Sequence, residues 1–189
     1  MEKILIKDIG KIDIKNKIIV FPTDTVYGIG CRIQDLNAVQ RIYDIKNRDF
    51  SKPLAILCPD DKIEDYVEEI SDEAYDLMKK YWPGALTIIF KKSDKIDDMI
   101  TSNKDTVGLR VPNNEIALAV LRKFGLMATT SMNISGQSAL NNIDDIEKYF
   151  GDKIDYLVID KCELSKVSST VVDASGQELK ILRQGDIKI

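Results

Sequence analysis

The chain has 189 residues, of which 44% are hydrophobic and 31% are charged, and its net charge is −4. This length and composition predict one globular domain over residues 1–189 and exclude a disordered chain. The negative balance argues against general affinity for nucleic acid, although a local basic groove is compatible with it.

Histidine is absent, which excludes Ser-His-Asp and Cys-His catalysis and ordinary His-bearing zinc sites. The cysteines Cys31, Cys58 and Cys162 lie far apart and form no C-x-x-C pair, which indicates reduced thiols in a cytoplasmic protein. Charges interrupt every apolar run near Met1, so we expect no signal peptide. No stretch approaches the ~20 apolar residues that span a membrane, and no side chain is predicted to bind a metal ion.

Apolar patterning predicts the elements that follow a weakly patterned N-terminal stretch. The first strong core strand is expected at Ile18–Phe21, ending before Pro22. In chain order there follow a helix over 37–46, a strand over 54–58, a helix over 71–81, strands over 86–90 and 107–111, a helix over 116–124, a strand over 126–130, a helix over 143–150, and strands over 156–159, 170–173 and 179–182. Strands interleaved with about four helices predict an α/β domain with a mixed twisted sheet, whose strand order the pattern does not give.

The strand at Ile18–Phe21 leads into a small polar cluster, Thr23, Asp24 and Thr25, beside a pair of glycines. A strand that ends in this way is typical of a ligand site at the edge of an α/β sheet. An ordinary turn after a strand accounts for the cluster equally well.

Cations form a second cluster, in which Lys46, Arg48 and Lys52 lie within seven positions. They predict either a clamp for phosphate groups or a solvated basic face. In the strand over 107–111, Arg110 alternates with apolar residues, so we expect its side chain opposite the core. It can pair with a structural carboxylate or with a ligand carboxylate, and the sequence leaves both open.

Hydroxyls and amides gather over 129–136, and hydroxyls again over 168–173 with Arg183 further on. Each segment is either a polar loop or a binding surface. Together with the cations, these groups suit anions, and they favour phosphoryl or nucleotidyl transfer by positioning and charge stabilisation. The P-loop motif is absent, and Ile33 stands where G-x-G-x-x-G needs its third glycine.

Six motifs occur in order: Phe21-Pro22-Thr23-Asp24-Thr25-Val26-Tyr27-Gly28, Lys46-x-Arg48, Trp82-Pro83-Gly84, Ser131-x-Asn133-x-Ser135-Gly136, Ser169-Thr170-Val171-Val172-Asp173 and Leu182-Arg183. With them the chain closely resembles the threonylcarbamoyl-AMP synthases of the YrdC/TsaC family over about residues 8–187. The resemblance implies a YrdC-like twisted open mixed sheet with a large, basic, concave cavity, in the short, single-domain form of the family.

The resemblance also implies an activity, in which L-threonine, bicarbonate and ATP, accompanied by Mg²⁺, give threonylcarbamoyl-adenylate and pyrophosphate. Proteins of a transfer complex would then modify an adenosine beside the anticodon of tRNA, which makes tRNA or double-stranded RNA a candidate partner. The positions implied for threonine binding are Thr25, Arg110, Ser131 and Ser169. The positions implied for ATP binding are Arg48, Lys52, Thr106, Asn133, Asn141 and Arg183. The signature residues Lys46 and Arg48 are implied in catalysis, Lys46 as a ligand of phosphate or bicarbonate.

Four positions depart from the family pattern. Asp49 adds an acid beside the expected phosphate clamp, and Thr130 precedes Ser131 where proline is common. Asn141 replaces a more usual threonine, and Leu57 occupies a position that sometimes holds histidine.

Two rival functions stay open. One is an RNA-binding or ribosome-associated paralogue on the same fold without synthase activity, against which the negative net charge weighs. The other is a carbamoyl-transfer domain like that of hydrogenase-maturation proteins, which would be expected beside zinc-finger-like and acylphosphatase-like parts.

Overall fold

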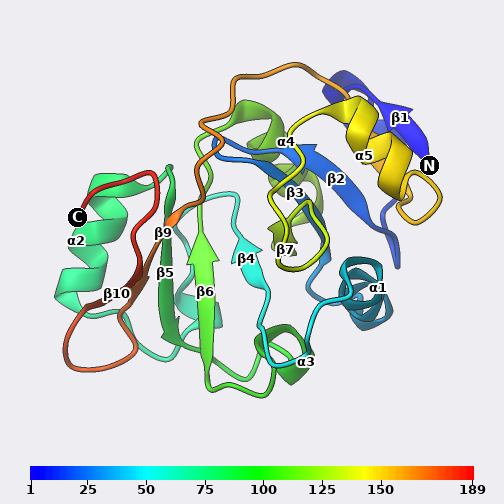
Figure 1. Cartoon of the computed structure of the whole chain (residues 1–189). Helices are drawn as coiled ribbons and strands as arrows, with labels where there is room; N and C mark the ends of the chain where they lie inside the picture. Colours follow the sequence, from blue (N-terminus) through cyan, green and yellow to red (C-terminus); the bar gives the residue numbers. More distant parts are fainter.

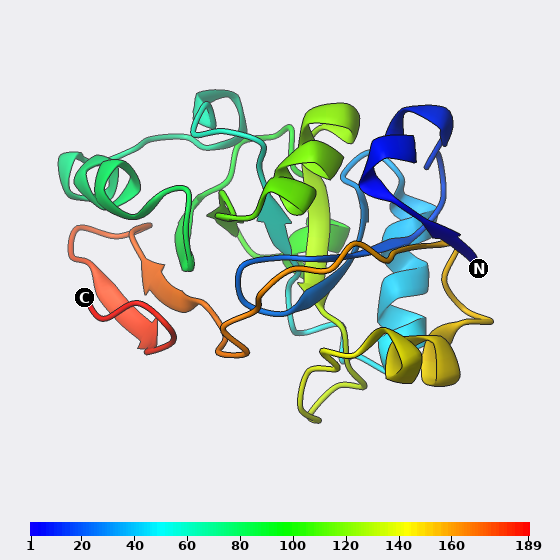
Figure 2. The ribbon, with the colours of Figure 1, turned by 90° about the horizontal axis from the view of Figure 1, so that it is seen from above.

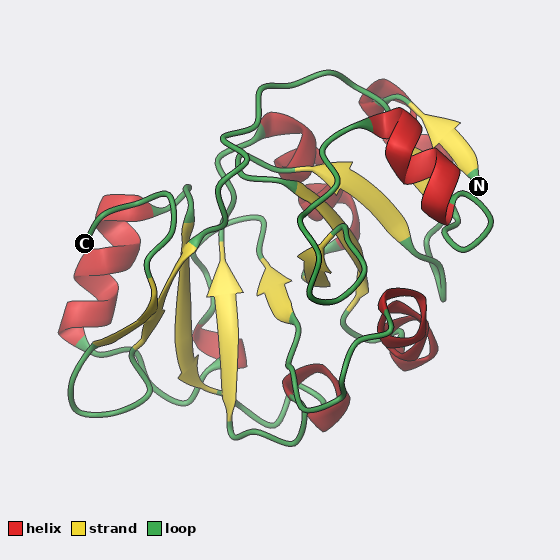
Figure 3. Cartoon of the chain, in the orientation of Figure 1, coloured by secondary structure: helices red, strands yellow, loops and turns green.

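The computed structural model describes residues 1–189 and shows one ten-stranded mixed sheet with helices around it (Figures 1 and 3). The strands are β1 (Glu2–Ile4), β2 (Ile19–Pro22), β3 (Tyr27–Arg32), β4 (Ala55–Leu57), β5 (Leu86–Lys91), β6 (Thr106–Arg110), β7 (Met127–Ser131), β8 (Tyr156–Val158), β9 (Thr170–Asp173) and β10 (Lys180–Arg183). The helices are α1 (Leu36–Lys46), α2 (Asp72–Tyr81), α3 (Asp98–Thr101), α4 (Glu115–Phe124) and α5 (Ile143–Phe150), with 3-10 segments at Ile6–Lys11 and Glu64–Tyr66. None of these helices has the length and apolar character needed to cross a membrane.

The sheet is open and twisted, with the strand order β1-β8-β2-β3-β7-β4-β6-β5-β9-β10. The sheet contains both parallel pairs, such as β4 with β6, and antiparallel pairs, such as β3 with β7. The N-terminus lies with β1 at one end of the sheet, close to α5, and the C-terminus lies at the other end beside α2 (Figures 1 and 2). The fold therefore agrees with the predicted mixed, twisted α/β sheet.

Hydrophobic packing occurs on both faces of this sheet. Helix α4 packs over one face and helps to enclose a cluster of 11 buried residues, while a second cluster of 34 includes residues of α1, α2 and α5. Strand β2 contributes to both clusters because its side chains alternate: Ile19 and Phe21 join the smaller and Val20 the larger. Leu57 of β4 belongs to the smaller cluster, which α4 covers, and it also lines a cavity. The cavity therefore lies on the same face of the sheet as α4.

Each predicted element lies within one residue of an observed one at both ends. The caps explain two of these boundaries. The Ser71 hydroxyl accepts a hydrogen bond from the Ala74 N–H at the start of α2, and the Asn114 side chain accepts two at the start of α4.

Strand β3 was not predicted, and its glycines are the reason. Gly28 and Gly30 weaken the strand pattern, although β3 pairs with β2 on one side and β7 on the other. A Cβ atom at Gly30 would lie 2.8 Å from Thr129 Oγ1, and one at Gly28 would lie 2.9 Å from Thr129 Cγ2. The glycines therefore leave space for a threonine of the neighbouring strand. The short elements β1 and α3 were also missed.

Candidate active site

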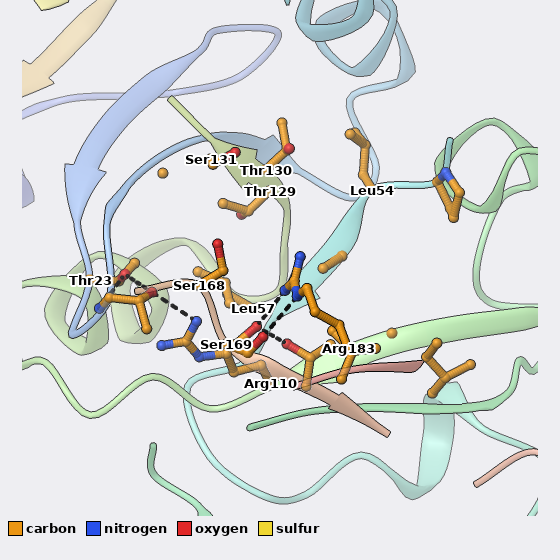
Figure 4. A pocket seen from close by; sticks show the side chains of 18 of the residues that line it. Thr23, Leu54, Leu57, Arg110, Thr129, Thr130, Ser131, Ser168, Ser169 and Arg183 are labelled. Carbon is orange, nitrogen blue, oxygen red and sulfur yellow. Dashed lines mark hydrogen bonds between the residues drawn. The ribbon is translucent and has the colours of Figure 1, made fainter. Parts of the chain in front are cut away.

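A cavity of about 350 Å³ lies over the central strands of the sheet (Figure 4). Strand β6 shows how it forms, because Thr106, Gly108 and Arg110 line the cavity while Val107 and Leu109 join the larger core. Further lining residues come from the other central strands and their loops: Gly28, Ala55, Leu57, Thr87, Ile89, Thr129, Ser131, Ser169 and Val171. Four lining residues are cations, namely Arg48, Lys104, Arg110 and Arg183, and none is an acid. The cavity is therefore suited to anions.

Arg110 lies at one wall of the cavity and is nearly fully buried. Its Nε donates to the Gly84 carbonyl at 2.9 Å, its Nη1 donates to Thr25 Oγ1 at 3.0 Å, and its Nη2 forms an ion pair with Asp24. Burial lowers the pKa of the Arg110 guanidinium, and the Asp24 carboxylate opposes that shift. A guanidinium has five N–H groups, so two are left for a ligand. Of the two pairings left open by the sequence, the structural carboxylate is present, and Arg110 still lines the cavity.

Thr25 is held in place by the hairpin turn between β2 and β3. The Thr23 hydroxyl donates to the Val26 carbonyl at 2.7 Å and accepts hydrogen bonds from the N–H groups of Thr25 and Val26. The hydroxyls of Thr23 and Thr25 lie 3.0 Å apart. This serine/threonine-type turn fixes the two hydroxyls beside the Arg110 guanidinium.

A second wall brings together Ser169 and Arg183 (Figure 4). Arg183 Nη2 donates to Ser169 Oγ at 3.1 Å, and its Nε donates to the Ser169 carbonyl at 3.0 Å. The β9–β10 hairpin makes this contact possible because it brings Arg183 opposite Val171, two residues from Ser169. Thr87 of β5 completes the group, with its hydroxyl 2.9 Å from Ser169 Oγ. Burial lowers the pKa of Arg183.

Arg48 lines the cavity from the loop between α1 and β4, whereas Lys52 does not. The Arg48 guanidinium folds onto its own loop and donates to the carbonyls of Lys52 at 3.0 Å and Pro53 at 2.9 Å. Lys52 contributes that carbonyl, and its side chain is exposed. Asp49 accepts a hydrogen bond from the Ser51 N–H and so stabilises the turn. Of the three cations predicted to form a phosphate clamp, Arg48 is thus the one that lines the cavity.

Lys46 does not line the cavity either, and its side chain is completely buried. Its Nζ donates to the Ser131 carbonyl, to the Asn133 carbonyl at 2.7 Å and to Asn133 Oδ1 at 2.6 Å. The Ser131 hydroxyl also donates to Asn133 Oδ1 at 2.8 Å. Burial, with a smaller effect from Arg48, lowers the pKa of Lys46 to about 7. The Lys46-x-Arg48 and Ser131-x-Asn133 motifs are therefore in direct contact, because the Lys46 side chain holds the Ser131–Asn133 turn.

The remaining candidates divide between the cavity and its surroundings. Ser131 and Thr106 line the cavity, as does Thr130. Asn133 and Asn141 lie outside its lining, and the buried Oδ1 atom of Asn141 has no hydrogen-bond partner.

Sequence analysis missed Thr87 and Lys104, whereas the lining residues Thr23, Thr129 and Ser168 belong to polar clusters that it had singled out. For Thr87 a signal existed, because it alternates with Ile89 along the cavity-facing side of β5. No cluster of three or more His, Cys, Asp or Glu side chains offers a metal site.

The open mixed sheet and its cavity define an α/β protein with a cation-lined cavity on one face of the sheet. The sequence profile of the Sua5/YciO/YrdC family, described as "Telomere recombination", matches residues 14–185. A Methanocaldococcus jannaschii protein provisionally named threonylcarbamoyl-AMP synthase is 37% identical, with 93% of this chain and 83% of the relative covered.

A Pyrococcus abyssi threonylcarbamoyl-AMP synthase is 35% identical over 93% of this chain, which spans about half of that relative's length (52%). The structure of P. abyssi Sua5 complexed with L-threonine superposes with a TM-score of 0.89 at 35% identity, covering 97% of this chain and 56% of that one. The chain belongs to the Sua5/YciO/YrdC family, whose members named here are enzymes, threonylcarbamoyl-AMP synthases.

Proposed function

We propose that this protein is a threonylcarbamoyl-AMP synthase that uses L-threonine, bicarbonate and ATP. The observation that carries the proposal is a single acid-free cavity in which Thr25 and Arg110 stand at one wall and Arg48 also lines the surface. Its cations and hydroxyls are suited to a carboxylate and to phosphates. Support for threonine comes from the P. abyssi relative, whose structure contains that amino acid.

The proposed reaction proceeds in two steps. The neutral amine of threonine adds to bicarbonate and loses water, which gives a carbamate. A carbamate oxygen then attacks the α-phosphorus of ATP, the bond to the β-phosphate oxygen breaks, and pyrophosphate leaves. The free N–H groups of Arg110 suit the threonine carboxylate, and the other cations offset charge that develops on the phosphates. The lining contains no carboxylate or histidine, so the amine proton passes to bicarbonate or water.

Magnesium would enter this scheme only as a companion of the nucleotide, because the cavity lining supplies no carboxylate ligand for the ion. Mg²⁺ in such enzymes is held by substrate phosphates together with one or two carboxylates. The ATP phosphates would therefore bring the ion. The product would pass to a transfer complex that modifies the adenosine beside the anticodon of tRNA.

The test is pyrophosphate release by the purified protein with each substrate omitted in turn. We expect release only when threonine, bicarbonate and ATP are all present. Release without threonine, or no release, would contradict the synthase. RNA binding that persists at high salt, without turnover, would favour the RNA-binding alternative.

A variant pair sharpens this test. Arg48→Ala should raise the KM for ATP about fivefold or more, because a charge-assisted contact is lost. Arg122→Ala is the matched control, since Arg122 is exposed and its pairing with Glu115, at 3.4 Å, lies on α4. Equal KM values in the two variants would remove Arg48 from the nucleotide site.

A further inference from the structure

Lys104 lies in a row of cavity-facing residues that begins before strand β6. Thr106, Gly108 and Arg110 line the cavity at every second position, and Lys104 continues the row by two residues. Alternate residues of a strand share one face, and although a bend at Asp105 separates Lys104 from the strand, Lys104 still lines the cavity. The row therefore carries a cation at each end, with a glycine between them that leaves the cavity floor open.

The backbone around Lys104 is fixed, while its side chain is free. Ser102 and Asn103 adopt left-handed conformations with φ of 59° and 60°, and the chain turns there from α3 into β6. The Lys104 N–H donates to the Thr101 carbonyl at 3.1 Å, and the hydroxyl of the buried Thr101 donates to the Lys104 carbonyl at 2.9 Å. The Lys104 ammonium forms no ion pair or hydrogen bond within the chain, so all three of its N–H groups can meet a ligand.

The other cations of the cavity already form hydrogen bonds or ion pairs within the protein. Arg110 is paired with Asp24, Arg183 is bonded to Ser169, and Arg48 is bonded to carbonyls of its own loop. These arginines present fixed donors, whereas a lysine supplies a mobile point charge. A charge that is both mobile and uncompensated is suited to the part of a ligand with the highest negative charge.

Distance along β6 indicates which part of the ligand that is. The strand residues Thr106 and Arg110 are four residues apart, which corresponds to about 13 Å, and Lys104 lies beyond Thr106 across a bend at Asp105. If Arg110 binds the threonine carboxylate, Lys104 stands at the far end of the substrate pair. We propose that Lys104 binds the terminal phosphates of the nucleotide, which leave as pyrophosphate, and that it takes the place at the cavity that resemblance gives to Lys52. This inference rests on the proposed function.

Binding of inorganic tripolyphosphate tests the proposal without requiring turnover. Calorimetry would compare the wild type with Lys104→Ala, Lys104→Arg and Lys52→Ala, with Lys62→Ala as the control for loss of an exposed charge. We expect Lys104→Ala to weaken binding about tenfold, Lys104→Arg to retain most of it, and Lys62→Ala to bind as the wild type does. In the steady state, Lys104→Ala should raise the KM for ATP and leave the KM for threonine unchanged.

Weakened binding in Lys52→Ala with unchanged binding in Lys104→Ala would overturn the proposal and return the site to Lys52. Equal binding by all variants would overturn it as well. Tripolyphosphate binding that depends on Lys104, in a protein that releases no pyrophosphate from its three substrates, would support the phosphate site while contradicting the synthase. The two hypotheses thus fail separately.

Discussion

Replacing Lys46 by methionine tests whether this lysine holds the Ser131–Asn133 turn. Methionine has a similar length and apolar character but lacks the terminal amino group. In the folded protein the Lys46 Nζ donates to two main-chain carbonyls, those of Ser131 and Asn133, and to the Asn133 side chain. Lys46→Met leaves both carbonyls without this donor, in a place where the lysine is completely buried.

The magnitude follows from these two carbonyls. A buried acceptor that loses its partner costs about 1–3 kcal/mol, and relaxation of the turn recovers part of the loss. We therefore expect Lys46→Met to lower the free energy of unfolding by about 2–4 kcal/mol at pH 8. Because Ser131 lines the cavity, the KM for the substrates should rise as well.

The same lysine predicts a dependence on pH. Burial lowers the pKa of Lys46 in the folded protein from 10.5 to about 7, so between those values the unfolded chain holds a proton that the folded protein has released. Unfolding then requires proton uptake, and the free energy of unfolding rises with pH by up to about 1.4 kcal/mol per unit in that range. The cost of burying the charge is present in full below pH 7 and disappears above pH 10.5. The rise should be absent in Lys46→Met.

Denaturation by urea at several pH values between 6 and 10 would measure both effects. Lys79→Met is the matched control, because Lys79 lies in the last turn of α2, as Lys46 lies in the last turn of α1, and is exposed. Equal unfolding free energies for Lys46→Met and the wild type would refute the reasoning. So would parallel pH curves for the two proteins.

Two further substitutions probe the cavity itself. Asp24→Asn removes the charge that accompanies the buried Arg110. It should lower the free energy of unfolding by about 2–4 kcal/mol in urea denaturation and raise the KM for threonine more than the KM for ATP. Equal changes in the two KM values would contradict the placement of Arg110. Gly108→Val fills the floor of the cavity, where even a Cβ atom would lie 3.3 Å from Thr87 Cγ2. It should raise the KM values for threonine and ATP about tenfold while changing the free energy of unfolding by less than about 2 kcal/mol. Unchanged KM values would place the substrates elsewhere.

Sequence patterns predicted the elements of the fold better than their arrangement. Apolar runs and helix caps are local signals, so β9 (Thr170–Asp173) and α5 (Ile143–Phe150) were predicted with their observed bounds. The strand order depends on pairing between distant segments, such as β5 with β9, and no local signal specifies it. Strand β3 was missed because its glycines match a threonine nearly 100 residues further on, a relation visible only after folding.

At the site, too, local features could be predicted from the sequence and contacts between distant segments could not. Alternation in β6 correctly placed Arg110 opposite the core, because the period of two is a local property. The burial of Lys46 was not foreseen, since lysine is almost never fully buried unless it is paired. Its three oxygen acceptors lie more than 80 residues away in the sequence. The position of Lys52 outside the cavity was equally hidden, because spacing along a loop does not determine where a side chain points.

The bonding of the arginines suggests how the cavity would promote a reaction without a base of its own. Arg48, Arg110 and Arg183 each hold their guanidinium against protein acceptors before any ligand binds. Donors fixed in this way lose little entropy when a substrate arrives, and they need not reorganise as charge develops. Lys104 lacks such acceptors and can follow a phosphate group that moves. Fixed arginines at the amino-acid and nucleotide walls, with one mobile lysine at the far end, would therefore align the substrates while allowing the leaving group to separate.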